Sequence, residues 1–159
     1  MITVESGAIA MDPVLVGVYS IHMIFAALWT GSVVFVTIAV LPTAMSGDGS
    51  PDPLSSMIGR LQTVSRASAL LLFLTGGHLA GTLYGIDSLT ASLRGNLVIA
   101  MLVLWFLLAG LVEVGASKLQ DGFDEQKLLE PARKARPFLF GATAVAILLL
   151  IDAGLLLGL

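Results

Sequence analysis

Long apolar stretches separated by short polar segments dominate this chain. Four stretches with few charged residues run over about 14–41, 63–84, 95–115 and 137–158. A helix needs about 20 mostly apolar residues to cross a bilayer, so each stretch predicts one transmembrane helix. The connection between the second and third stretches, Gly85–Arg94, is short, which favours antiparallel neighbours. The pattern therefore predicts an all-α polytopic membrane protein, with residues 1–159 forming a single domain folded as a four-transmembrane-helix antiparallel bundle.

Composition agrees with this pattern and excludes several classes of protein. The chain is 57% hydrophobic and only 12% charged, whereas soluble domains are roughly 25% charged. A soluble domain of this size cannot bury so much apolar surface. The net charge of −3 argues against a nucleic-acid binder, and the absence of cysteine excludes disulfides, thiolate metal sites and iron–sulfur clusters.

The distribution of Lys and Arg predicts the orientation in the cell membrane. Positive residues are retained on the cytoplasmic side. Arg94 alone falls on the side of the second connection, and seven others fall on the side of the first and third connections. We therefore expect a multi-pass protein with both termini extracytoplasmic. The seven are Arg60, Arg66, Lys118, Lys127, Arg133, Lys134 and Arg136.

Ionisable groups within membrane spans are costly and indicate function by default. His22, His78 and Asp152 each lie six to eight residues from the extracytoplasmic end of a span. At 1.5 Å per residue this places them at a common depth, roughly 10 Å below the outer surface. Met101 in the third span lies at the same level. The sequence thus predicts one layer of His, His, Met and Asp shared by four helices.

Helical periodicity extends this layer into a candidate metal site. His22 and His78 are the predicted ligands of a metal ion or of heme iron, and both fall on stripes of small or polar residues. Asp152, Met101 and Tyr19 are candidates for additional ligands or for groups that hold the ligands in place. The residues expected to line the pocket are Trp29, Gly77, Gly81 and Trp105.

Two further ionisable residues lie near the cytoplasmic ends of the spans. Arg66 and Glu113 are each about five residues from the end of consecutive helices. Pairing is the least costly arrangement for two opposite charges at that level. We therefore expect a structural Arg66–Glu113 ion pair.

The first two spans carry motifs that resemble the copper-resistance D (CopD) family. The segment H-M-I-F-A-A-L-W-T-G, from His22 to Gly31, is similar to the first span of that family. S-R-A-S at 65–68 and L-T-G-G-H at 74–78 are similar to its second span. The resemblance carries His22, Trp29 and Gly31 over by position and implies copper handling at or across the membrane. The spacing of His22 and Trp29 also resembles the HemJ membrane family, which implies heme b.

The residues leave three functions open. Imidazole with a thioether suits Cu(I), and imidazole with a carboxylate suits Cu(II). Two histidines would also suit heme b in a membrane redox protein. The third alternative is a non-catalytic scaffold or subunit, in which the histidines and Asp152 only hydrogen-bond one another. No hydrolase or nucleotide-binding motif occurs, so no catalytic residue is predicted. The expected partners are the lipid bilayer and a second copy or a membrane subunit.

Overall fold

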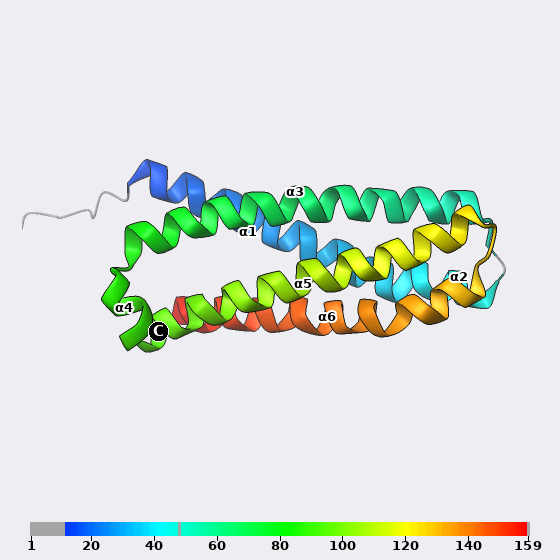
Figure 1. The fold of residues 1–159 in the computed structure, drawn as a ribbon. Coiled ribbons are helices and arrows are strands. Elements are labelled where there is room, and N and C mark those ends of the chain that lie inside the picture. Colours follow the sequence, from blue (N-terminus) through cyan, green and yellow to red (C-terminus); the bar gives the residue numbers. More distant parts are fainter. Residues whose placement is uncertain (1–11, 48, 159) are drawn as a thin grey trace, which may run out of the picture.

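The protein is an all-helical bundle. The computed structural model describes residues 12–47 and 49–158, and these contain helices and short connections but no strand. Figure 1 shows them in chain order. The elements are α1 (Pro13–Phe35), η1 (Val36–Val40), α2 (Leu41–Ser46), α3 (Pro51–Leu83), α4 (Ile86–Ala91), α5 (Leu93–Asp124) and α6 (Leu129–Gly158).

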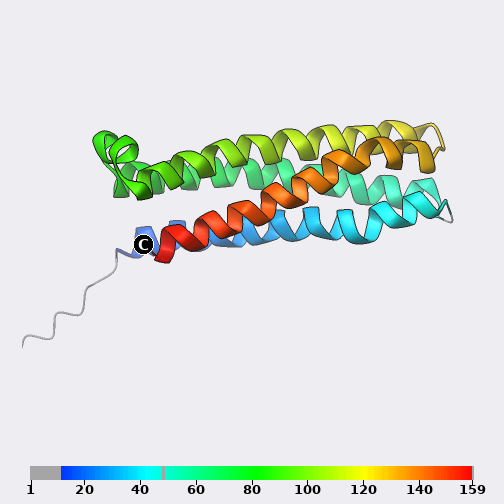
Figure 2. The ribbon, with the colours of Figure 1, turned by 90° about the horizontal axis from the view of Figure 1, so that it is seen from below.

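Four long rods run side by side and alternate in direction. The first rod is α1, η1 and α2 in series, where η1 is a single π-helical turn. The α2–α3 and α5–α6 connections lie together at one end of the bundle, and α4 and the C-terminal end of α6 lie at the other (Figures 1 and 2). Three of the rods are long and apolar enough to cross a membrane, namely Pro13–Ser46, Leu93–Asp124 and Leu129–Gly158. The prediction of a membrane-like all-α protein is confirmed at this level.

The helices extend beyond the predicted spans. α3 begins at Pro51 rather than near 63, and α5 continues to Asp124. α6 begins at Leu129, so Pro137 lies inside the helix. The predicted span begins at 137 and would place Pro137 in the first turn instead. The segments flanking the spans are charged but rich in good helix formers. The apolar pattern therefore marks the apolar part of each rod and not its ends.

Close packing joins α5 to α6, the most extensively packed pair of helices. Buried small residues such as Ala116, Ala135 and Ala142 allow the two backbones to approach. Gly122 makes the closest approach, because a Cβ atom there would collide with the ring of Pro131.

Hydrogen bonds between buried side chains link the other helices. The indole Nε1 of Trp29 on α1 donates to Ser65 Oγ on α3 over 2.8 Å. Thr143 Oγ1 on α6 donates to Thr37 Oγ1 in η1 over 2.9 Å, and Thr37 is buried. Such bonds have no competing water in apolar surroundings, so they define which faces of the helices meet.

Candidate functional site

His22 is the best-defined polar group in the outer half of the bundle. Its Nδ1 atom lies 2.8 Å from Oγ1 of Thr75 on the facing helix α3. Thr75 Oγ1 in turn donates its single proton to the carbonyl of Leu71 over 2.6 Å. With the hydroxyl proton of Thr75 on Leu71, Nδ1 is the donor in the His22–Thr75 bond, and the opposite tautomer requires that proton to turn towards Nδ1. In the neutral ring a proton on Nδ1 leaves the lone pair on Nε2, which has no hydrogen-bond partner within 12–47 and 49–158.

Gly76 holds the same imidazole from the side. A Cβ atom at Gly76 would lie 3.2 Å from Cε1 of His22 and 3.8 Å from Nδ1. The ring thus packs directly against the glycine backbone. Thr75 determines which nitrogen carries the proton, and Gly76 determines where the ring lies.

His22 lines a cavity of about 380 Å³ that is shared by all four rods. This volume is within the range of small-molecule sites, roughly 300–1,000 Å³. Apolar side chains make up most of the wall, together with Thr30 and the glycines of α3. Leu89 of the short helix α4 also contributes.

Several predicted site residues meet in this cavity. Trp29, Gly77, Met101 and Trp105 all line it with His22. Met23 lines it too and was missed by the sequence reasoning. Met23 directly follows His22 in the sequence, and this is the only signal for it. The signal is weak, because adjacent residues on a helix point roughly 100° apart.

The structure places His78 elsewhere and corrects the expectation of two facing histidines. His78 is exposed on α3 and is not one of the residues that line the cavity. Counting residues from the helix end predicts the depth of His78 along α3, but it does not predict the face of α3 on which His78 lies. Gly76 packs against His22, and two further residues at roughly 100° each turn His78 to the opposite side of α3. The cavity therefore contains one histidine.

Three other candidates also lie outside the cavity wall. Gly81 is exposed and Tyr19 is half-buried, and neither lines the cavity. Asp152 is only 6% exposed, and its Oδ2 has no hydrogen-bond partner among the described residues. Its helix neighbours Leu149 and Ala153 line the cavity, so the carboxylate lies beside the site without forming its wall.

Arg66 and Glu113 form the expected ion pair. Nε of Arg66 donates to Oε2 of Glu113 over 3.2 Å, and Nη2 donates to Oε1. The two side chains are 65% and 42% exposed, respectively. The pair joins α3 to α5 on the outside of the bundle and has no contact with the cavity wall.

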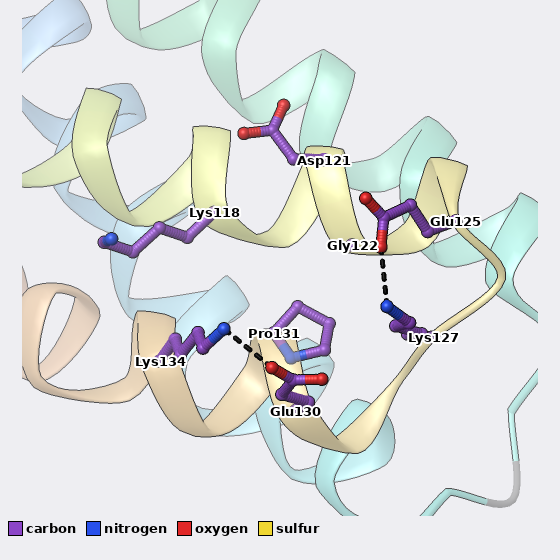
Figure 3. Close-up of a pocket in the computed structure, with 8 residues that line it drawn as sticks. All are labelled: Lys118, Asp121, Gly122, Glu125, Lys127, Glu130, Pro131 and Lys134. Carbon is purple, nitrogen blue, oxygen red and sulfur yellow. Dashed lines mark hydrogen bonds and ion pairs between the residues drawn. The ribbon is translucent and has the colours of Figure 1, made fainter.

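A second, polar cleft of about 250 Å³ lies where α5 turns into α6 (Figure 3). Lys134 pairs with Glu130, and Lys127 pairs with Glu125, each over 2.7 Å. The hydrogen bond and charge of Glu125 raise the pKa of Lys127. Three lysines and three carboxylates line this cleft, so their formal charges sum to zero. These charges are Lys118, Lys127, Lys134, Asp121, Glu125 and Glu130.

The donor atoms of the cavity fit a soft metal ion. The wall supplies the imidazole of His22 and the thioethers of Met23 and Met101, which are ligands that copper accepts. Among the described residues there is no cluster of three or more His, Cys, Asp or Glu. A site built on carboxylates or on two histidines does not fit these residues.

Comparisons of the chain with family models, with curated proteins and with solved structures find no match. The resemblance to the CopD family therefore stands on the motifs of α1 and α3 alone.

Gly76→Ala tests the packing of His22. The new methyl group must push the imidazole, which the bond to Thr75 holds in place, so we expect Gly76→Ala to have an unfolding free energy roughly 1–3 kcal/mol below that of Gly77→Ala. Gly77→Ala is the matched control, because a Cβ atom at Gly77 meets nothing within 4 Å. Unfolding in detergent, followed by circular dichroism, compares the two variants. A Gly76→Ala variant as stable as Gly77→Ala, or more stable, would contradict the described packing.

Proposed function

We propose that the chain is a four-span protein of the cell membrane that binds copper in the cavity next to His22. α3 is the fourth span in this proposal. It is as long as the three apolar helices and packs between α1 and α5. Its Arg66, which lowers its apolar character, is paired with Glu113.

The orientation follows from the two ends of the bundle. The α2–α3 and α5–α6 connections share one end, and that end carries most of the Lys and Arg residues. The positive-inside rule assigns this end to the cytoplasm. Both termini and the cavity beside α4 then lie towards the extracytoplasmic side, where an ion from outside would arrive first.

One observation carries the copper proposal: Nε2 of His22 has no hydrogen-bond partner among the described residues, and His22 lines the same largely apolar cavity as a second metal ligand, Met101. A neutral imidazole nitrogen without a protein partner can bind a metal ion. The Thr75 bond orients the ring as carboxylate or carbonyl partners orient metal-bound histidines elsewhere. Copper held there would be bound by His22 and Met101, and the chain's role would be copper handling, as the CopD-like motifs imply.

The Arg66–Glu113 pair tests the fourth span. In water an exposed pair is worth roughly 0–1 kcal/mol. In a bilayer, Arg66→Leu or Glu113→Leu leaves one charge without its partner, which costs more than removing both charges together. We expect each single variant to be less stable than the double variant when unfolded by SDS from bicelles. Additive losses in the double-mutant cycle would contradict the proposal.

His22→Ala tests the metal site, and His78→Ala is its matched control. The purified protein is loaded with copper in detergent, and bound copper is measured by elemental analysis. We expect one copper per wild-type chain, none in His22→Ala and full occupancy in His78→Ala, because only His22 lines the cavity.

The other outcomes decide between the alternatives. Full occupancy in His22→Ala would place copper elsewhere. A Soret band in the purified wild-type protein would replace copper by heme. Wild-type protein that retains neither copper nor heme would favour a non-catalytic scaffold or subunit.

A further inference from the structure

The wall of the cavity is uncharged as well as apolar. Its 21 lining residues include no Asp, Glu, Lys or Arg. Asp152, the nearest candidate for a negative ligand, is not among them. The wall itself therefore offers an ion no carboxylate ligand, although Asp152 lies beside it.

This lack of charge discriminates between ions. The cost of moving an ion from water into a low-dielectric medium rises with the square of its charge, and it is already large for a monovalent ion. A divalent ion would lose about four times as much hydration as a monovalent ion of the same size. One imidazole and two thioethers offset a smaller share of that loss for Zn²⁺ or Cu²⁺ than for a monovalent soft ion.

The donor atoms also favour monovalent ions. Met23 and Met101 reach the cavity from α1 and α5, respectively, and the imidazole of His22 is a third neutral donor. Thioethers are soft ligands that select Cu(I) among the common ions of the cell. Ag(I) has the same charge and similar softness.

Trp105 adds an aromatic wall. It lies one helical turn after Met101, so both side chains share a face of α5. Its ring is held by Phe73 and Phe106, at centroid distances of 5.4 and 4.6 Å. Its Nε1 is buried with no hydrogen-bond partner in the part of the chain that the structure describes. An indole ring attracts cations without adding a negative charge.

We propose that this cavity selects monovalent soft cations, with Met23 and Met101 as thioether ligands beside His22 and Trp105 as a cation–π wall. The inference rests on the proposed metal site at His22 and adds the oxidation state, cuprous, and three residues that select it.

Silver provides the direct probe, because Ag⁺ is stable in air. Titration calorimetry in detergent compares Ag⁺ with Zn²⁺ and Cu²⁺ on the wild-type protein. We expect Ag⁺ to bind at least about 100-fold more tightly than Zn²⁺, a difference of about 2.7 kcal/mol. Cu²⁺ is expected to be the weaker of the two copper ions when Cu⁺ is measured without oxygen against a cuprous chelator.

Substitutions test the named residues. Met23→Leu combined with Met101→Leu keeps the volume and removes both sulfurs, so Ag⁺ affinity should fall at least about tenfold. Trp105→Leu should weaken it roughly 2- to 30-fold, with Trp105→Phe intermediate. Met57→Leu is the matched control, because Met57 is exposed on α3 away from the cavity. Ag⁺ should also quench the fluorescence of Trp29→Phe, in which Trp105 is the one tryptophan.

Each failure has a distinct meaning. If no ion binds the wild type, or if His22→Ala binds as well as the wild type, the proposed metal site itself fails. If binding depends on His22 but Zn²⁺ binds as tightly as Ag⁺, or the double methionine variant keeps full Ag⁺ affinity, the site stands and its selectivity for monovalent soft ions is wrong.

Discussion

Polar side chains in an apolar bundle must find partners within the bundle, and this constraint determines which helix faces meet. Trp29 with Ser65 joins α1 to α3, Arg66 with Glu113 joins α3 to α5, and Thr37 with Thr143 joins η1 to α6. Each bond alone is modest, on the order of 0.6 kcal/mol for hydrogen bonds between membrane helices. Their importance lies in register, because rotation of either helix would leave both groups unpaired.

The same constraint shapes the candidate site. His22 satisfies one ring nitrogen through Thr75, and Thr75 satisfies its own hydroxyl through its own helix. That chain of donors ends at a backbone carbonyl, and Nε2 has no hydrogen-bond partner among the described residues. Gly76 makes the arrangement sterically possible. The site is thus one imidazole held on two sides, in a wall that is otherwise apolar.

Much of the fold could be predicted from the sequence, because hydropathy reports apolar length directly. The pairing of Arg66 with Glu113 followed from charge and depth. The helix ends could not be predicted from hydropathy, since charged segments outside the apolar part remain good helix formers and Pro137 is accommodated within α6.

The site was predicted in part, for a geometric reason. Depth along a helix can be counted in residues, so His22 and Met101 were predicted on one level. The face of a helix that meets its neighbour depends on packing, and no count of residues reveals it. His78 was therefore assigned to the wrong face of α3, and Met23 was missed.

The central claim is that Thr75 holds the proton of His22 on Nδ1 and leaves Nε2 free. Nitrogen-15 NMR of histidine-labelled protein in lipid, in a His78→Ala background with His22 as the one histidine, measures this directly. The account predicts a neutral ring with a protonated Nδ1 and an unprotonated Nε2 in the metal-free protein. A signal from the Nε2–H tautomer, unchanged in Thr75→Val, would contradict it.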